Sequence, residues 1–274
     1  MKRKITVEEK ANKLPELDFD RDEIIGLTEH HHDFYSRFLK NERDIIVWFP
    51  PSYLSSFKYY PVIYMHDGQN LFNPHTSFIG YDWKVDETAT KLIKNGKMEE
   101  AIIVGIYNTK ERLNEYNFFR PEGKAYANFI IGELKPFIDE NYRTITSKDN
   151  TAIIGSSMGG LISFQLAWNF PNVFGKCGAM SSSFWVDDRK IFDEVKNDPQ
   201  PKKDLKIYID CGSAETELID DTKKMIDLLH GFGYREGREM KSRIEEGAVH
   251  SEVDWAKRLN IPFTFLFEKN EIYF

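Results

Sequence analysis

From residue 61 onward, short apolar runs alternate with segments whose apolar residues recur at helical spacing. The runs PVIYMHDG (61–68) and AIIVGIYN (101–108) are continuous, as expected for strands buried on both faces. Between them, DWKVDETATKLIKNG (82–96) has the helical period and ends at a glycine. This alternation predicts an α/β protein with a mostly parallel sheet, right-handed crossovers and helices on both faces.

The remaining elements follow the same rule. Further strands are expected at 150–160, 176–185 and 205–213, and 238–247 is expected as a last inner strand. Helices are expected at 125–142 (bent at Pro136), 161–170, 215–231 and 251–259. Before residue 61, segments 33–41 and 43–50 are predicted to form an antiparallel pair of strands. The polar residues 1–22 are expected to be a loosely held arm, and 23–274 a single domain.

Composition excludes several classes of function. The formal charge is −7, and no run of lysine and arginine forms a stripe that could neutralise phosphates, so a nucleic-acid partner is not expected. No stretch is apolar enough for a signal peptide or a membrane span, which favours the cytoplasm and no membrane partner. The two cysteines, Cys177 and Cys211, lie in apolar runs and are interpreted as buried thiols. Consecutive residues of a strand face opposite ways, so His30-His31-His32 is not expected to bind a metal.

The sequence GSSMG at 155–159 matches the pattern G-x-S-x-G, with Ser157 at its centre. The pattern alone is common, but here it joins a short apolar strand to a helix, as a nucleophile elbow does. A tight turn would lift the serine hydroxyl out of the sheet, and glycine on either side would relieve the crowding. Ser157 is therefore the predicted nucleophile, and a serine- and glycine-rich turn without chemistry is the alternative.

Two histidines follow Ser157 and could act as its base. His230 falls in the last turn of a predicted helix, where an imidazole commonly serves as a capping residue. His250 follows a predicted strand and precedes a helix, in a short loop that could carry it over the sheet edge. His250 is therefore the preferred base.

The acid that orients the base should follow the strand LKIYIDC. Glu215 stands at the junction between that strand and the next helix and is the preferred acid. A first-turn acid that favours the helix dipole is its alternative reading. Four other carboxylates stay open as the acid: Asp210 inside the strand, and Glu217, Asp220 and Asp221 on the helix.

Two backbone N–H groups are expected to form an oxyanion hole. One belongs to Met158, the residue after the nucleophile. The second is expected from the loop HDGQN (66–70), at Gln69 or else Asn70, although this loop could equally be an ordinary turn. His66 is interpreted as a structural contact. Four aromatic residues on loops are candidates for the substrate-binding rim, with core packing as the alternative: Trp83, Tyr116, Phe184 and Trp185.

These residues resemble the putative-esterase family of α/β-hydrolases, which includes enterochelin esterase-like enzymes, feruloyl esterases, S-formylglutathione hydrolases and mycolyltransferases. The resemblance covers the chain from about residue 30 and rests on RDIIVWFPPSY, PVIYMHDGQNLF, GSSMGG, CGSAE and GAVHSEVDWAKRL. It implies an α/β-hydrolase fold, Ser157, Glu215 and His250 as a catalytic triad, and Gln69 and Met158 as the oxyanion hole. Many relatives carry aspartate where Glu215 stands.

The expected function is cofactor-independent hydrolysis of a carboxylic ester through an acyl-enzyme on Ser157. The substrate is expected to be a small-molecule or carbohydrate ester, with a short acyl group or of the siderophore type. Two alternatives remain: an acyltransferase that uses the same triad, and a noncatalytic member of the fold that binds a carbohydrate or partner. The sequence leaves a homodimer open.

Overall fold

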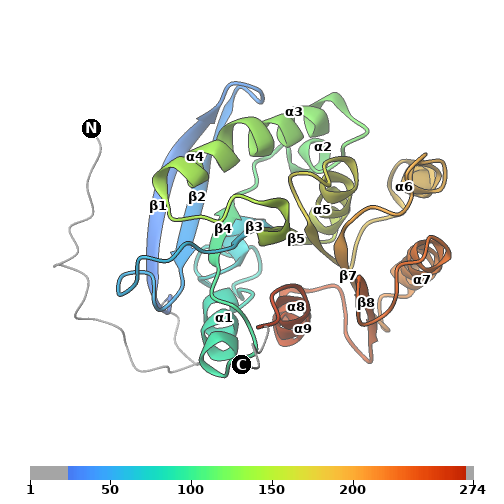
Figure 1. The fold of residues 1–274 in the computed structure, drawn as a ribbon. Coiled ribbons are helices and arrows are strands. Elements are labelled where there is room, and N and C mark those ends of the chain that lie inside the picture. Colours follow the sequence, from blue (N-terminus) through green and yellow to red (C-terminus); the bar gives the residue numbers. More distant parts are fainter. Residues whose placement is uncertain (1–23, 270–274) are drawn as a thin grey trace.

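One eight-stranded sheet organises the molecule, in the order β1-β2-β4-β3-β5-β6-β7-β8 (Figure 1). The computed structural model describes residues 24–269. β2 is antiparallel to β1 and to β4, and all other neighbours are parallel. The strands are β1 (Leu27–Ser36), β2 (Asn41–Phe49), β3 (Val62–His66), β4 (Ile102–Ile106), β5 (Thr151–Ser156), β6 (Lys176–Met180), β7 (Lys206–Gly212) and β8 (Met240–Glu245). This topology confirms the predicted mostly parallel α/β-hydrolase sheet with antiparallel N-terminal strands.

Helices cover both faces of the sheet (Figure 1). The α-helices are α1 (Val85–Lys94), α2 (Arg112–Glu115), α3 (Pro121–Phe129), α4 (Lys135–Asn141), α5 (Met158–Asn169), α6 (Val186–Lys196), α7 (Thr216–Gly231), α8 (Glu252–Arg258) and α9 (Asn260–Leu266). Short helical turns of other types are η2 (Gly68–Asn70), η3 (Ile130–Leu134) and η4 (Lys148–Asn150). α3, α4 and α5 lie over one face, whereas α1, α8 and α9 lie over the other. None of the helices within 24–269 is both long and apolar enough to cross a membrane.

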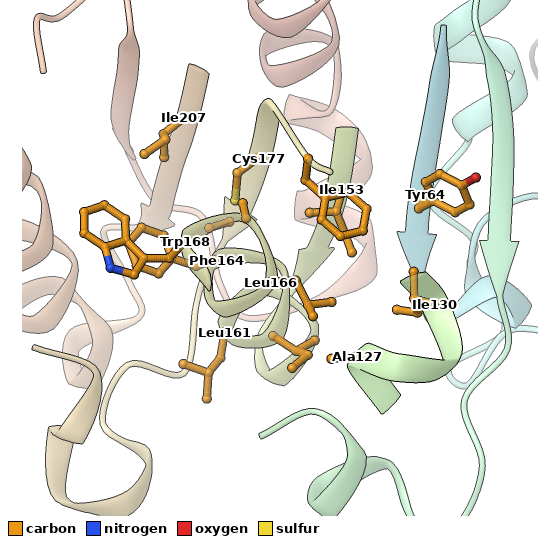
Figure 2. Packing of buried hydrophobic residues seen from close by; sticks show 14 of the residues in the cluster. Tyr64, Ala127, Ile130, Ile153, Leu161, Phe164, Leu166, Trp168, Cys177 and Ile207 are labelled. Carbon is orange, nitrogen blue, oxygen red and sulfur yellow. The ribbon is translucent and has the colours of Figure 1, made fainter. Parts of the chain in front are cut away.

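Helix α5 is buried along almost its whole length and packs into the core on one face of the sheet (Figure 2). Its sequence MGGLISFQLAWN is apolar on nearly every side, and residues 158–168 are all buried. A helix that is apolar all round belongs inside a core rather than on a surface. Leu161 and Phe164 pack into the same cluster as Ile153 of β5 and Cys177 of β6. This packing fixes the start of α5, where Ser157 lies.

The two N-terminal strands pair as expected, but they begin earlier than the sequence indicates. β1 spans 27–36 rather than 33–41, and β2 begins at Asn41. The turn between them occupies residues 37–40 and places Lys40 at a φ of 55°. Glycine, asparagine or aspartate is the usual residue at such a φ, and the turn RFLK contains none of them, so the sequence carries no signal for it.

The helix predicted over 125–142 consists of three pieces. A π-helical turn over 130–134 separates α3 from α4, and Pro136 stands in the first turn of α4. Proline has no N–H to donate to the carbonyl four residues earlier, so the distortion lies ahead of the proline. The interruption therefore begins earlier than residue 136.

The expectation that 238–247 forms an inner strand is wrong. β8 pairs only with β7 and is the edge of the sheet. Its side chains are mostly partly exposed, and Lys241, Arg243 and Glu245 place charges along it. Charges on an edge strand discourage pairing with another chain, which accounts for the pattern KSRIE.

Candidate active site

Ser157 occupies the sharp turn between β5 and α5. Its φ of 57° and ψ of −124° lie outside the regions that residues other than glycine usually adopt. The N–H of Ser157 donates to the carbonyl oxygen of Met180 at the end of β6, and its own carbonyl oxygen accepts from the N–H of Ser183. The turn is therefore held from both sides by the end of the neighbouring strand. Strain of this kind, stabilised by surrounding contacts, is typical of functional sites.

The first glycine of the motif is required by close packing of the backbone. A Cβ added at Gly155 would lie 2.6 Å from the carbonyl carbon of Gly159. We expect Gly155→Ala to lower the free energy of unfolding by about 1–3 kcal/mol, because an overpacked core must shift. Urea unfolding would measure the change. Gly231→Ala is the matched control, since its Cβ would meet nothing within 4 Å. Equal stability of the two variants would contradict the packing argument.

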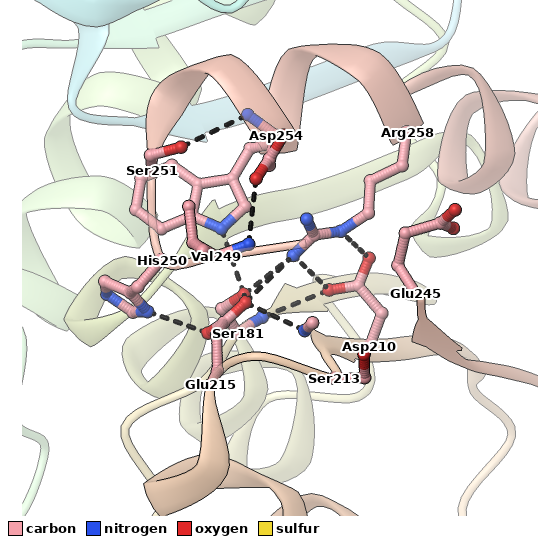
Figure 3. Close-up of polar contacts among 12 residues, drawn as sticks. Ser181, Asp210, Ser213, Glu215, Glu245, Val249, His250, Ser251, Asp254 and Arg258 are labelled. Atoms are coloured by element: carbon pink, nitrogen blue, oxygen red, sulfur yellow. Dashed lines mark hydrogen bonds and ion pairs between the residues drawn. The ribbon is translucent and has the colours of Figure 1, made fainter. Parts of the chain in front are cut away.

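His250 and Glu215 meet at the carboxyl edge of the sheet (Figure 3). His250 lies in the loop between β8 and α8, and Glu215 directly precedes α7. Nδ1 of His250 is 2.9 Å from Oε2 of Glu215. A carboxylate only accepts hydrogen bonds, so this contact places the ring proton on Nδ1 and leaves Nε2 as an acceptor. The arrangement is that of a base and its orienting acid.

Ser157, Glu215 and His250 line one cavity of about 470 Å³. The other residues lining it are Ser183, Trp185, Ala214, Thr216, Glu217 and Leu218. The Glu215 side chain is 2% exposed, whereas that of His250 is 41% exposed. Oγ of Ser157 lies 3.4 Å from Oγ of Ser183, which is its hydrogen-bonding contact among the described residues. Hydrogen bonds between nucleophile and base often tighten only when substrate binds.

The charge of Glu215 is stabilised by the donors around it. Burial raises the pKa of this carboxyl, but hydrogen bonds from His250, Ser181 and the N–H of Gly212 lower it more, so the pKa stays below its usual value. Ser181 Oγ and the Gly212 nitrogen each lie 2.8 Å from Oε1. Glu215 is therefore ionised at neutral pH, as an acid that orients a histidine must be.

The other carboxylates that the sequence left open have different partners or positions. Asp210 is fully buried and pairs with Arg258, at 2.8 Å between Oδ2 and Nε. Asp221 pairs with Arg189 at 2.7 Å. Glu217 and Asp220 are exposed on α7. None of these four hydrogen-bonds His250, so within 24–269 the geometry favours Glu215.

The remaining histidines lie away from the cavity. His230 is exposed in the last turn of α7. His66 is buried at the end of β3, where Nδ1 lies 2.9 Å from the hydroxyl of Tyr126. Burial lowers the pKa of His66 to about 3, which keeps its ring neutral. On β1, His31 contacts Tyr142 and His32 contacts Asp44, so these side chains do not converge.

The loop after β3 lies beside the start of α5. A Cβ added at Gly159 would lie 3.3 Å from Cβ of His66. The loop turns through Asp67, whose φ is 57°, into η2. The N–H of Asn70 already donates to the carbonyl oxygen of Asp67 at 2.8 Å. Of the two residues predicted to supply the second backbone donor of an oxyanion hole, the geometry therefore favours Gln69 over Asn70. Met158 begins α5, and the first N–H groups of a helix lack intrahelical acceptors.

Two residues that the sequence reasoning missed hold this loop. Arg112 makes a bidentate contact with Asp67, with Nε and Nη2 at 2.7 and 2.8 Å from its two carboxylate oxygens. The amide of Asn108 donates to the same carboxylate at 2.6 Å. Burial raises the pKa of Asp67, but the hydrogen bonds from Arg112 and Asn108 and the charge of Arg112 lower this pKa by more. The carboxyl therefore stays ionised. No local pattern in the sequence marks Arg112 or Asn108 as partners of Asp67.

The predicted aromatic rim is largely wrong. Trp83 and Tyr116 are 2% and 0% exposed, and Phe184 is also fully buried. Trp83 packs against Trp255, and Tyr116 packs against His66 and Tyr126, so core packing accounts for them. Trp185 differs, because it is 51% exposed and lines the cavity. A loop position in the sequence does not reveal whether an aromatic ring points inward.

Within 24–269, one group of side chains has the spacing of a metal site, formed by Asp82, Asp86 and Glu87 at the start of α1. All three are buried, and Lys84 Nζ lies 3.4 Å from both Asp82 and Glu87. Burial and the neighbouring Glu87 raise the pKa of Asp86, so this carboxyl holds a proton. The lysine and the proton together reduce the negative charge of the group.

The fold and the strand-to-helix elbow define an α/β-hydrolase. The sequence matches the family described as putative esterase over residues 36–261. The chain therefore belongs to the putative-esterase family. Membership of this family supports cleavage of an ester bond as the reaction of the site.

Several proteins are similar to this chain. The uncharacterized protein YjcH of Bacillus subtilis is 30% identical over 224 residues, which cover 80% of this chain and 85% of that protein. An endo-1,4-beta-xylanase/feruloyl esterase of Xylanibacter ruminicola is 26% identical and matches 73% of this chain but 25% of its own length. Among solved structures, a ferulic acid esterase has a TM-score of 0.72 at 23% identity, covering 88% of this chain and 97% of that one. Enterochelin esterase from Shigella flexneri has a TM-score of 0.74 at 19% identity, covering 90% of this chain and 60% of that one.

Proposed function

We propose that the protein is a serine esterase with Ser157 as nucleophile, His250 as base and Glu215 as acid. The observation that carries the proposal is the shared cavity: the strained serine opens into the same space as a histidine whose Nδ1 is hydrogen-bonded to a buried carboxylate. A buried carboxylate fixes the histidine tautomer and stabilises the imidazolium that forms when the serine loses its proton.

In the first step, Oγ of Ser157 attacks the ester carbonyl while Nε2 of His250 takes the hydroxyl proton. The tetrahedral intermediate collapses, the carbon–oxygen bond to the alcohol breaks, and His250 returns the proton to the leaving alcohol. In the second step, His250 takes a proton from water, and the oxygen of that water attacks the acyl-enzyme carbonyl. The bond from the acyl carbon to Oγ of Ser157 then breaks, His250 returns the proton to Oγ, and the carboxylic acid leaves. Glu215 stays ionised throughout.

The negative oxygen of each intermediate is held by the N–H groups of Met158 and Gln69. Two observations support this pair. The first N–H groups of α5 lack intrahelical acceptors, and the loop after β3 lies beside Gly159 of that helix. The N-terminus of a helix also carries a partial positive charge, which favours an oxyanion there. Asp67 and its partner Arg112 keep the loop in place.

The substrate is proposed to be a small-molecule or carbohydrate ester, either with a short acyl group or of the siderophore type, and no cofactor is required. Trp185 supports this, because an exposed indole beside the cavity offers a flat surface for a sugar or aromatic ring. Similar proteins are named as a feruloyl esterase and an enterochelin esterase, which agrees with an ester substrate. Adding glycerol or a sugar acceptor to the assay would reveal transfer of the acyl group in place of hydrolysis.

A fluorophosphonate probe tests the nucleophile directly. We expect the probe to label the wild-type protein and to leave Ser157→Ala unlabelled, because only an activated serine hydroxyl reacts with it at a useful rate. The same preparations would be assayed on p-nitrophenyl acetate, butyrate and octanoate, methyl ferulate and acetylated xylan. Equal labelling of both proteins would overturn the proposal, and binding of an ester without labelling or turnover would favour a binding role.

A further inference from the structure

Ser181 links Glu215 to the buried ion pair of Asp210 and Arg258, on the side of Glu215 away from His250 (Figure 3). It directly follows β6, is fully buried, and has a φ of 42°. Its hydroxyl oxygen lies 2.8 Å from Oε1 of Glu215, 3.0 Å from Nε1 of Trp255 and 2.7 Å from Nη2 of Arg258. The catalytic cycle proposed above gives no role to the contacts of Ser181 with Trp255 and Arg258.

The direction of these hydrogen bonds follows from the chemistry of the groups. The indole N–H of Trp255 and the guanidinium of Arg258 can only donate. The hydroxyl of Ser181 therefore accepts from both, which uses its two lone pairs. Its single proton remains for Glu215, so the hydroxyl can only point toward that carboxylate.

The two carboxylate oxygens of Glu215 therefore have different hydrogen-bond partners. Oε1 accepts from Ser181 and from the N–H of Gly212, and Arg258 Nη2 lies 3.5 Å away from it. Oε2 accepts from His250. Because Oε1 is occupied by fixed donors, the carboxylate cannot rotate without losing them, and Oε2 stays directed at the imidazole.

Arg258 is itself held in place by Asp210 and is 2% exposed. With His250 neutral, the charges of Glu215, Asp210 and Arg258 leave this buried group with one negative charge. Transfer of the serine proton to His250 would neutralise it. The arginine thus balances Asp210 and leaves the charge of Glu215 available to the imidazolium.

Helix α8 supplies both donors to Ser181. It begins two residues after His250, and Trp255 also packs edge-on against the imidazole, with ring centroids 4.9 Å apart at 84°. Trp255 and Arg258 are three residues apart and therefore share one face of the helix. One helix accordingly orients the base and the acid together.

We propose that Ser181 is a positioning residue, whose hydroxyl is locked by Trp255 and Arg258 so that it holds Glu215 in the orientation that serves His250. This inference rests on the proposed esterase function. It adds Ser181, Trp255 and Arg258 to the residues that prepare the reaction, and they act through Glu215 and His250 rather than on the substrate.

The test compares Ser181→Ala with Ser36→Ala. Ser36 is also fully buried and donates to a glutamate, Glu133, at 2.7 Å, but it lies on β1. We expect both variants to lose similar stability in urea, while only Ser181→Ala loses about tenfold in kcat, with KM changed less than twofold. Should Ser181→Ala fail to fold, Ser181→Gly serves in its place, because glycine adopts a positive φ without strain.

A spectroscopic measurement separates positioning from general loosening. The proton between His250 and Glu215 should give a downfield signal in the proton NMR spectrum. This signal is assigned by its loss in Glu215→Ala. We expect this resonance to move or broaden in the Ser181 variant and to stay unchanged in Ser36→Ala. An unchanged resonance and unchanged kcat in the Ser181 variant, with Ser157→Ala inactive, would overturn the inference alone. Full activity of Ser157→Ala would instead overturn the proposed function.

Discussion

Replacing Ser157 with alanine is expected to lower kcat for p-nitrophenyl acetate by on the order of 10⁶-fold, because removal of a triad nucleophile eliminates the acyl-enzyme route. The fold should persist, since the change removes one oxygen atom from a residue that lines a cavity. Thermal melting and circular dichroism would confirm folding, and stopped or continuous assays at saturating ester would give kcat.

Ser156 provides the matched control for this experiment. It is adjacent in the chain, 2% exposed and the last residue of β5. We expect Ser156→Ala to keep kcat within about tenfold of the wild type, because Ser156 is buried and does not line the cavity. Comparable loss in both variants would mean that the turn, rather than the Ser157 hydroxyl, is what the reaction needs.

The second large effect is expected from Glu215→Gln. The amide of glutamine can donate to Nδ1 of His250 and so stabilise the tautomer with its proton on Nε2, which cannot act as the base. In a serine protease, the corresponding exchange of acid for amide costs about 10⁴-fold in kcat, and a similar loss is expected here. Steady-state kinetics at neutral pH would measure it.

Asp210→Asn separates the role of Glu215 from that of its buried neighbour. Loss of this charge leaves Arg258 only its longer contact with Glu215, at 3.5 Å, as an ion pair in the core, so the free energy of unfolding should fall by about 3 kcal/mol. Because Asp210 does not contact His250, the folded variant should lose less than about 100-fold in kcat. A larger kinetic loss in Asp210→Asn than in Glu215→Gln would reverse the assignment of the acid.

The strands and helices that position the site could be predicted from local sequence wherever the apolar pattern was strong. β3 and β4 are continuous apolar runs and appear within a few residues of their expected bounds. α6 and α9 were not predicted. In α6, the residues 187–189 have positive φ values, and in α9 a proline interrupts the pattern, so neither has a regular helical signal.

The position of the candidate triad was also readable from the sequence. In a parallel sheet all carboxyl ends meet at one edge, so residues that follow β5, β7 and β8 are brought together whatever their separation along the chain. The orientation of aromatic rings was not readable in this way. Trp83 and Trp185 both follow loop-like stretches, yet one is in the core and the other lines the cavity.

By itself, the sequence determined the alternation of strands and helices, the strand-to-helix turn at Ser157 and the order in which Ser157, Glu215 and His250 follow the strands of the sheet. These depend on local patterns and chain order, which a single sequence contains. Only the tertiary structure decided that Glu215, rather than Asp210, contacts His250. It also decided that Ser181 hydrogen-bonds Glu215 and that Arg258 hydrogen-bonds Ser181. Such contacts join residues 34 to 77 positions apart, and their energies depend on packing and burial that no local pattern records.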